Sequence, residues 1–527
     1  MKARFALVLA VSTVLAACRG DDPDVTQPSG AGAPSASAAV AQEELFTIVP
    51  APALTRAQEN LLATIRGRPS AGEVHVARVA ASPGRSLQHG RAVRVRVAPD
   101  RQVVAVGEEA VQRGPDAVSW AGTTQGEPGW VQLVLTERGV TGTVRTASTL
   151  YHVEPLGGGL HAISRTEVAT LPPEHSPEAP SGASGVERGS GRGQSGGGEG
   201  GLVSALSGSQ IDLLVVYTAS AAGATGDING LIQLAVDETN TSYTNSGITA
   251  TVAKAHVAQV TYTESGRSYQ QHVDALVGTA DGMMDAVHTL RNQYLADVVV
   301  LVLNDGAFCG QAGGIKATST TAFAVVHVGC ATGNYSFGHE IGHLQGARHD
   351  RAVDNSSTPY QYGHGYVAPT LNWRTVMAYV NACGSCLRVQ YWSNPGVTYP
   401  PTGQAMGTAT YEHDARVLNE TQATVAAFRE LAVVIGGKQN IARYESAQYT
   451  ATPASGLGPY TYQWRARQGS PSFWGSWGSW FSTGSQNYTF ASISSCGLDR
   501  IELQVQATDS RGKVGTSSYL IYLTNPC

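Results

Sequence analysis

The sequence predicts a multidomain protein with a central α/β domain between two mostly β regions. In residues 209–431, strongly apolar, strand-like runs alternate with segments of helical periodicity. Residues 44–173 and 433–527 instead contain short runs in which apolar and polar side chains alternate, as in half-buried strands. A segment rich in Gly, Ser and Pro, residues 174–202, separates the first two regions and cannot bury a core of its own.

The chain begins with an expected export signal. A basic start and an apolar run, too short for a stable membrane span, lead to small residues before Cys18. Residues 15–18 resemble the lipobox of bacterial lipoproteins, whose cysteine is lipidated; an ordinary signal peptide cut near Ala17 is the alternative. Residues 19–43 have the composition of a disordered tether. We therefore expect an exported protein that touches the outer membrane or cell surface only through a lipid anchor.

The composition excludes nucleic acid as an expected partner. The net charge is −5, and Lys and Arg are neither in excess nor clustered. A charged fraction of only 14%, together with 61 glycines, fits an exported, loop-rich protein instead.

The cysteine count suggests disulfides. Seven cysteines are present, and six remain if Cys18 carries a lipid, an even number in a chain bound for an oxidising compartment. Their clustering favours the pairs Cys309–Cys330, Cys383–Cys386 and Cys496–Cys527. The C-x-x-C at 383–386 could instead be a redox pair or half of a zinc ribbon, but no second C-x-x-C completes a ribbon.

The central region begins with an apolar strand near Ile211 and continues as an α/β alternation. We expect a helix over 228–246, a strand over 249–261, a helix over 269–294, and buried strands in "ADVVVLVL" and "AFAVVHV". An amphipathic helix over 415–431 closes the region.

The C-terminal region resembles a β-sandwich module of the immunoglobulin-like or PKD-like kind. Its strands are expected in "YTYQW" and "IELQVQATDSRGKV", with Trp464 in the place of the core tryptophan. Trp474, Trp477 and Trp480, in "FWGSWGSW", either pack within the module or present aromatic faces to a substrate or a surface glycan.

The stretch "HEIGHLQGARHD", residues 339–350, has the spacing of a metal site. On a helix, His339 and His343 project from one face and can share a metal. Gly346 lets the chain leave the helix, so that His349 can return as a third ligand and leave one position for water and substrate. Three histidines with a water position favour a single Zn²⁺ ion.

Glu340 is placed for catalysis rather than for metal binding. Next to the first histidine, it can hold and deprotonate a metal-activated water while it stays outside the ligand set. Zinc lowers the pKa of such a water to about 7. By composition, the full His-Glu-x-x-His-x-x-Gly-x-x-His pattern arises by chance with odds on the order of one in ten thousand, so we favour the catalytic interpretation.

These residues resemble the zinc signature of the metzincin metalloproteases. Asp350, directly after the third histidine, is typical of the reprolysin-like members, and "RTVMAY" supplies Met377 for the methionine turn that packs beneath the metal. Other stretches between 209 and 431, such as "YGHGY" and "CGSCLRVQYWSNP", are similar to the bacterial peptidyl-Asp metalloendopeptidases. The resemblance implies a metzincin catalytic domain, a mixed twisted sheet with an active-site helix, that hydrolyses proteins or peptides on the amino side of Asp.

The same resemblance implies further site residues. Cleavage before Asp requires a cation in the pocket for the residue after the scissile bond, and metzincins wall this pocket with the segment after the methionine turn. Arg388 lies in that segment and Arg374 precedes the turn, although either could be a structural salt-bridge partner. Tyr379 stands where astacin-like and serralysin-like metzincins carry a tyrosine that approaches zinc or stabilises the oxyanion; packing or substrate contact is the alternative.

Other candidate ligands receive a structural interpretation. His364 and His413 have no partner at ligand spacing, so we expect structural or surface roles for both. Calcium is possible in this fold family, but the sequence has no EF-hand-like or tandem Asp-Gly pattern to support it.

Two other functions compete with proteolysis. One is a non-peptidase zinc hydrolase on the same scaffold. The other is a surface binding protein that acts through its tryptophan-bearing C-terminal module and retains a vestigial metal site. The presence of Glu340 argues against a vestigial site, because the base is the residue such a site no longer needs.

The region before the linker is expected to be a prodomain. It loosely resembles reprolysin propeptides, but the only cysteine before Cys309 is Cys18, so a lipid there would exclude a cysteine switch. We expect a carboxylate or the folded prodomain to mask the site, and a cut between about 174 and 202 to activate the enzyme and free it from its anchor. Mass spectrometry of the mature active enzyme should find no lipid; a lipidated active enzyme would contradict the release.

Overall fold

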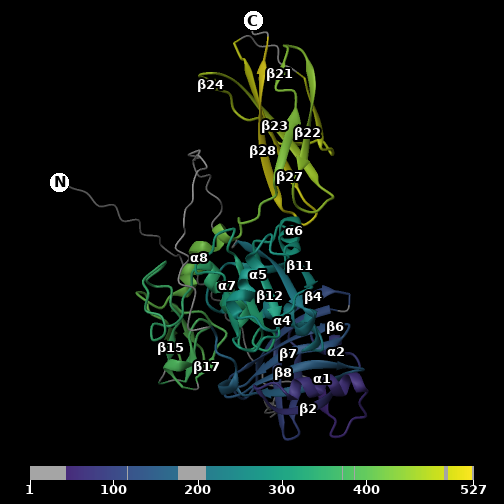
Figure 1. Cartoon of the computed structure of the whole chain (residues 1–527), viewed down its shortest axis with the longest axis vertical. Coiled ribbons are helices and arrows are strands. Elements are labelled where there is room, and N and C mark those ends of the chain that lie inside the picture. The colour runs from purple at the N-terminus through teal and green to yellow at the C-terminus, as the bar shows by residue number, and fades with distance from the viewer. Residues whose placement is uncertain are drawn as a thin grey trace, which may run out of the picture. The chain divides into compact units, whose positions relative to one another are not determined.

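The computed structural model describes residues 43–115, 117–175, 209–368, 370, 372–384, 386–491 and 497–524 (Figure 1). The lipobox cysteine Cys18, the tether up to residue 42, the linker beyond His175 and the predicted Cys496–Cys527 pair lie outside these ranges. Among the described residues, no helix has the length and apolar character needed to cross a membrane.

The N-terminal region is a closed β-barrel with the strand order β1-β2-β9-β8-β7-β6-β5-β4-β3. Its strands are β1 (Glu43–Ile48), β2 (Ala71–Val79), β3 (Ala92–Ala98), β4 (Arg101–Gly114), β5 (Ala117–Thr124), β6 (Trp130–Thr136), β7 (Gly139–Arg145), β8 (Leu150–Gly157) and β9 (Leu160–Thr166). The barrel closes because β1 pairs with both β2 and β3, and the alternate residues Val93, Val95 and Val97 of β3 lie in its core. Two short helices, α1 (Arg56–Arg66) and α2 (Pro83–Ser86), and a final 3-10 turn, η1 (Val168–Thr170), accompany the strands.

The central region is built on a five-stranded sheet in the order β11-β10-β12-β14-β13. The strands are β10 (Gln210–Thr218), β11 (Thr251–Val260), β12 (Val298–Leu303), β13 (Gly310–Ala312) and β14 (Phe323–His327). The first four strands in this order are parallel, and the edge strand β13 pairs antiparallel with β14. Every residue of β12, "VVVLVL", is buried, as expected for a strand covered on both faces.

Helices cover both faces of this sheet. They are α3 (Ala219–Gly223), α4 (Ile228–Asn245), α5 (Tyr269–Val277), α6 (Ala286–Gln293), α7 (Ser336–Gln345) and α8 (Asp414–Val425). Alternate residues of β10 enter two separate cores: Leu213 and Val215 pack with α4, α7 and α8, whereas Leu214 and Val216 pack with α5 and α6. The predicted α/β alternation with a mixed sheet is therefore confirmed.

Two predicted helix boundaries are wrong. The helix expected over 269–294 is interrupted, because Gly278 ends α5 and Gly282 adopts a φ of +75° before α6 begins. The closing helix expected over 415–431 ends at Val425, and the backbone N–H of Arg429 donates to the carboxylate of Asp297 instead of continuing the helix.

Short strands and turns follow α7 and carry several predicted site residues. They are β15 (Val367–Ala368), β16 (Trp373–Arg374), η2 (Val380–Ala382), β17 (Leu387–Arg388), β18 (Asn394–Tyr399) and β19 (Gln404–Met406). Two of the predicted disulfides, Cys309–Cys330 and Cys383–Cys386, are present.

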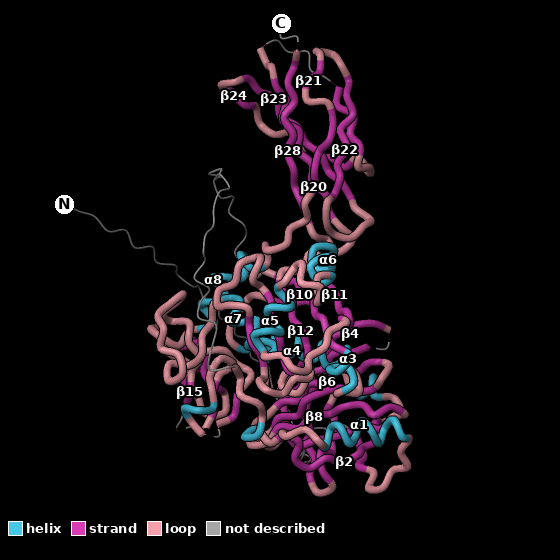
Figure 2. Tube along the Cα trace, in the orientation of Figure 1, coloured by secondary structure: helices cyan, strands magenta, loops and turns pink. Residues whose placement is uncertain are grey.

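The C-terminal region consists of two sheets that share one core (Figure 2). One sheet joins β20 (Val433–Gly437), β22 (Ser446–Pro453) and β26 (Asn487–Ala491); the other joins β21 (Asn440–Ile441), β28 (Val514–Leu523), β27 (Arg500–Thr508), β23 (Thr461–Ser470), β24 (Phe473–Trp474) and β25 (Phe481–Ser482). Trp464 lies fully buried in this core, where the sequence placed it. The rings of Trp474, Trp477 and Trp480 stack with the guanidinium groups of Arg465 and Arg467.

Helix α7 packs directly against the side chains of Met377 and Trp392. The helix can approach them closely because Gly342 has no side chain: a Cβ there would lie 2.4 Å from Cη2 of Trp392 and 3.2 Å from Sδ of Met377. Both of these side chains are fully buried. The glycine therefore fixes how closely the helix approaches the segment beneath it.

We expect Gly342→Ala to destabilise the protein by overpacking, at a cost of about 1–3 kcal/mol. Thermal unfolding would show this as a lower melting temperature. Gly223→Ala is the matched control, because a Cβ at this end of α3 meets nothing within 4 Å. Equal melting temperatures for the two variants would contradict the close packing of α7 at Gly342.

Candidate active site

Helix α7 and the turn after it direct three histidines toward one point. His339 and His343 lie one helical turn apart on α7. The helix ends at Gly346, whose φ of +115° is available to glycine at little cost and whose N–H bonds back to the last turn. The chain then reverses, so that His349 faces the two helical histidines, as the sequence predicted.

The distances between these imidazoles fit a shared metal ion. The Nε2–Nε2 separations are 3.1 Å for His339–His343, 3.0 Å for His343–His349 and 3.3 Å for His339–His349. Ligand bonds of about 2.0–2.1 Å at tetrahedral angles would place such nitrogens roughly 3.3–3.4 Å apart. The three nitrogens therefore lie close to the spacing that one zinc ion requires.

Backbone carbonyls fix the tautomers of the helical histidines. The Nδ1–H of His339 donates to the carbonyl of Val376 at 2.9 Å, and the Nδ1–H of His343 donates to the carbonyl of Ala347 at 2.9 Å. Burial also lowers the pKa of His343 to about 4, so this ring is neutral. Each Nε2 is left as a lone-pair donor aimed at the common point.

A fourth histidine, His175, joins this group and was missed in the sequence. Its Nε2 lies 3.2 Å from Nε2 of His339, and its side chain is almost completely buried. The ligand atoms of all four histidines lie within 4.8 Å of one another. Among the described residues, no second group of three or more His, Cys, Asp or Glu side chains comes close enough to share an ion. The donor set, four imidazole nitrogens, is one that zinc accepts.

Glu340 lies beside the histidines in full burial. Its Oε1 is 3.2 Å from Nε2 of His175, and neither carboxylate oxygen has a well-formed hydrogen bond. Burial raises the pKa of Glu340 to about 8, whereas a cation held by the histidines would favour the ionised form. Buried oxygens without donors, next to converging imidazole lone pairs, fit a site built around a cation and a water.

Two buried arginines lie near this group. Arg388 and Arg374, hereafter the arginine pair, both donate to the carbonyl of Ala378 and are at most 3% exposed. Burial and the neighbouring charge of Arg388 lower the pKa of Arg374 well below its usual range. Two guanidinium groups this deeply buried require an anion nearby.

Glu174 supplies that anion. Its Oε1 lies 2.7 Å from Nη2 of Arg388, and it also accepts from Nδ2 of Asn334 at 3.1 Å and from the hydroxyl of Ser336 at 3.3 Å. Burial alone would raise the pKa of this carboxyl, but the arginine pair holds it below the usual range. Arg388 thus forms a salt bridge within the chain, the alternative that the sequence left open, although the sequence did not identify Glu174 as its partner.

Comparison with known proteins places these residues in a family. The model described as metallo-peptidase family M12 matches residues 207–393. A peptidyl-Asp metalloendopeptidase of Stenotrophomonas maltophilia (strain K279a) is 39% identical over 362 residues, which cover 66% of this chain and 81% of that protein. The protein of the same name from Xanthomonas campestris pv. campestris is 43% identical over 322 residues, 60% of this chain and 74% of its own length.

The chain belongs to the reprolysin-like metallopeptidases. It is therefore a zinc metalloendopeptidase, and its substrates are proteins or peptides. The matched segment contains α7 and the three histidines of the predicted signature, but it begins after His175.

In this metallopeptidase, Asp350 links the third histidine to the segment beneath α7. Its Oδ2 accepts from the backbone N–H of Tyr379 at 2.8 Å, and its Oδ1 accepts from the N–H of Ala352 at 3.1 Å. Met377, two residues before Tyr379, is fully buried under Gly342. Asp350 and Met377 thus stabilise the segment on which α7 packs. Neither residue belongs to the group of side chains that could bind the metal.

Tyr379 packs beside the histidine group. Its ring centroid is 4.2 Å from that of His349, and burial keeps the pKa of its hydroxyl well above the usual value. The hydroxyl is therefore protonated at any physiological pH and remains a hydrogen-bond donor.

The two other histidines of the sequence analysis lie outside the metallopeptidase's histidine group. His364 is buried and donates from Nδ1 to the carbonyl of His349 at 2.8 Å, which fixes the backbone of the third histidine. His413 is the partly exposed residue that precedes α8.

With His175 also replaced by alanine, we expect His343→Ala to lose tightly bound zinc, because only His339 and His349 remain and two histidines provide too few ligands for a stable zinc site. Zinc content after dialysis, measured by mass spectrometry of the metal, checks this. His413→Ala, combined with the same change at His175, is the matched control and should keep one zinc per chain. Stoichiometric zinc in the chain that lacks both His175 and His343 would contradict the assignment of the ligands.

Proposed function

We propose that the protein hydrolyses peptide bonds on the amino side of aspartate, with Glu340 as the general base. The observation that carries this proposal is the carboxylate of Glu174 held at 2.7 Å by Arg388, next to the histidine group. It supports a site in which a buried guanidinium group receives an acidic side chain. Peptidyl-Asp metalloendopeptidase, the name of the relatives, agrees with that chemistry.

The proposed mechanism assigns the metal to His339, His343 and His349. When bound there, zinc supplies a Lewis acid that polarises the scissile carbonyl and acidifies a nearby water. Glu340 takes the proton from that water as it attacks the carbonyl carbon, and then passes the proton to the departing amide nitrogen. Full burial of Glu340 suits this role, because a carboxylate in a dry site exchanges its proton readily near neutral pH.

Tyr379 is proposed to assist at the carbonyl oxygen. Its protonated hydroxyl can donate to the negative charge that develops on this oxygen, and its backbone is fixed by Asp350. The ring contact with His349 keeps the side chain beside the reacting group.

The arginine pair is proposed to select the residue after the scissile bond. With Glu174 removed, two buried guanidinium groups would remain near one another without the carboxylate that now pairs with Arg388. An aspartate side chain of a substrate restores that pair, whereas an apolar or amide side chain leaves a buried charge unpaired.

The flanking regions complete the proposal. We infer that the N-terminal barrel is a prodomain, that export and lipid attachment use the signal ending at Cys18, and that the mature enzyme acts outside the cell. The C-terminal region, with its two sheets and buried Trp464, supports an immunoglobulin-like or PKD-like module that binds substrate or a surface glycan.

Glu340→Gln should lower the turnover of a denatured protein substrate by roughly 10²–10⁴-fold while zinc stays bound, because only the general base is lost. Tyr379→Phe should lower turnover less, by about tenfold, with KM little changed. Glu420→Gln, on the exposed face of α8, is the matched control. Unchanged proteolysis by Glu340→Gln would refute the mechanism, and hydrolysis of small esters without cleavage of proteins would support a non-peptidase hydrolase instead.

In the mature enzyme, from which Glu174 has left with the barrel, Arg388→Gln should change specificity more than folding, because no buried carboxylate of the chain loses its partner. Loss of a charge-assisted pair of about 2 kcal/mol would reduce the kcat/KM ratio for peptides with Asp over Asn after the scissile bond by roughly 30-fold. Arg416→Gln, which removes an exposed arginine of α8, should leave the ratio unchanged. Cleavage sites identified by mass spectrometry give the same comparison for whole proteins. An unaltered preference for Asp in Arg388→Gln would exclude this residue from recognition.

A further inference from the structure

The segment after the barrel, residues 171–175, reaches the histidine group of the active site through His175. It follows β9 and η1 and pairs with the start of β13: the N–H of Cys309 donates to the carbonyl of Pro173 at 2.7 Å, and the N–H of Gly310 donates to the carbonyl of Glu174 at 3.1 Å. Because β13 is the edge strand of the central sheet, these two bonds fasten the segment beside the sheet edge.

We propose that Glu174 and His175 form an autoinhibitory latch, in which His175 is a fourth ligand of the catalytic zinc and Glu174 occupies the aspartate site. This inference rests on the proposed function, since it assigns an inhibitor to the same metal and the same arginine pair. The latch is held by the chain itself and requires no cysteine.

The position of His175 carries the first half of the latch. Its Nε2 is 3.2 Å from both Nε2 of His339 and Oε1 of Glu340, so the imidazole stands between the metal ligands and the base. A catalytic zinc site needs one position for water and substrate, and this is the position that the ring fills. Water can neither reach the metal nor be held by Glu340 while His175 stays in place.

The second ring nitrogen suggests that His175 is a replaceable ligand. In His339 and His343, Nδ1–H donates to a carbonyl, which orients each ring. Nδ1 of His175 is buried without a hydrogen-bond partner. His175 therefore lacks the outer support that the helical ligands have, as expected for a ligand that must leave on activation.

The contacts of Glu174 carry the second half. Its carboxylate pairs with Arg388 and accepts from Asn334 and Ser336, so it satisfies the charge that a substrate aspartate would satisfy. The peptide bond on the amino side of Glu174 is not presented for hydrolysis, because the carbonyl of Pro173 accepts from the N–H of Cys309 at 2.7 Å. The segment thus offers the side chain of a substrate together with a ligand in place of the attacking water.

Buried contacts between the barrel and the metallopeptidase region hold the latch in position. Arg145 of β7 donates to the carbonyls of Gly333 and Arg388, at 3.3 and 3.2 Å. Thr143, also on β7, donates to Oε1 of Glu238 in α4 at 2.6 Å, while Oε2 of the same carboxylate accepts from the N–H of Gly333. Both contacts lead to the loop just before α7.

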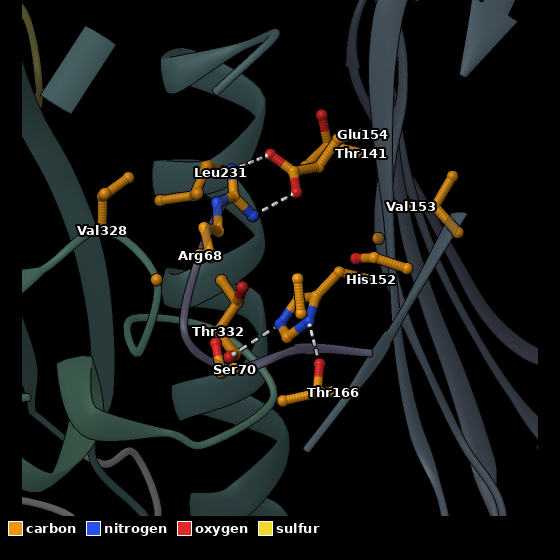
Figure 3. A pocket seen from close by; sticks show the side chains of 14 residues that line it. Arg68, Ser70, Thr141, His152, Val153, Glu154, Thr166, Leu231, Val328 and Thr332 are labelled. Atoms are coloured by element: carbon orange, nitrogen blue, oxygen red, sulfur yellow. Dashed lines mark hydrogen bonds and ion pairs between the residues drawn. The ribbon is translucent and has the colours of Figure 1, made fainter. Parts of the chain in front are cut away.

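A second set of barrel contacts lies around a small interface pocket (Figure 3). Arg68 pairs with Glu154 of β8 at 2.6 Å and donates to the carbonyl of Ala224, at the end of α3. His152 of β8 bonds both to the hydroxyl of Thr166 and to the carbonyl of Thr332. A cut beyond His175 would leave all these contacts intact, so the latch would remain in place until the barrel dissociates or is degraded.

Zinc coordination in the full chain tests the latch without any need for activity. The Glu340→Gln chain, which cannot process itself, is loaded with zinc and measured by X-ray absorption at the zinc edge. We expect four imidazole nitrogens at about 2.0–2.1 Å, and three with one oxygen when His175→Ala is added. Three imidazoles in the Glu340→Gln chain would overturn the proposal.

Activity of the unprocessed chain gives a second test. Intact His175→Ala chains, verified as uncut by gel electrophoresis, should cleave an Asp-containing peptide at least about tenfold faster than intact wild type. His175→Asn should show the same increase, and it guards against a folding defect in the first variant. His89→Ala, on the exposed barrel surface, should cleave the peptide no faster than intact wild type. Equally slow peptide cleavage by correctly folded His175→Ala, His175→Asn and wild-type chains would overturn the latch.

Two further measurements distinguish a failure of the proposed function from a failure of the latch. Processed wild-type enzyme that binds zinc but cleaves no peptide would refute the function, whatever the coordination number of zinc in the full chain. Processed enzyme that cleaves before Asp, combined with three imidazoles in the uncut chain, would refute the latch alone.

Discussion

The convergence of unprotonated imidazole nitrogens is the constraint on which the rest of the active site depends. Lone pairs that face one another at 3.0–3.3 Å repel unless a cation lies among them, so the surroundings must both direct them inward and keep them neutral. The backbone carbonyls of Val376 and Ala347 direct two of them, and burial keeps them neutral. The left-handed turn at Gly346 and the missing side chain at Gly342 are the geometric conditions for this arrangement.

Buried ionisable side chains impose a second constraint around the histidine group. The arginine pair, Glu174, Glu340 and Glu238 are all withdrawn from water, and each is tolerated only with a partner or a change of protonation. Burial raises the pKa of Glu238 to about 7, and the barrel supplies the hydroxyl of Thr143 to it. The N-terminal barrel thus does more than cover the site, since it completes hydrogen bonds that the metallopeptidase region leaves open.

The sequence predicted the parts of the site that are local in the chain. His339, Glu340, His343, Gly346 and His349 lie within eleven residues, where helical geometry relates the first three and the left-handed turn at Gly346 brings back His349. Strong apolar runs located the central strands in the same way. The break between α5 and α6 was missed because the apolar periodicity continues across Gly278 and Gly282, where backbone conformation decides instead.

His175 was missed for a different reason. It belongs to a Pro- and Gly-rich stretch whose composition predicts a linker, and 164 residues separate it from its partner His339. Contacts over such separations depend on how the barrel docks, which no local pattern encodes. The one available signal was a Glu-His pair at 174–175, shortly after the last barrel strand and η1, which composition alone does not distinguish from solvent-exposed linker residues.

The covalent link between the barrel and the catalytic region determines whether inhibition depends on protein concentration. While the chain is continuous, inhibition is a property of each molecule, so dilution does not weaken it. Once the chain is cut, the same contacts become an equilibrium between two molecules, and their occupancy falls as the concentration falls. An enzyme cut at high concentration would then stay inhibited there and become active once it is diluted.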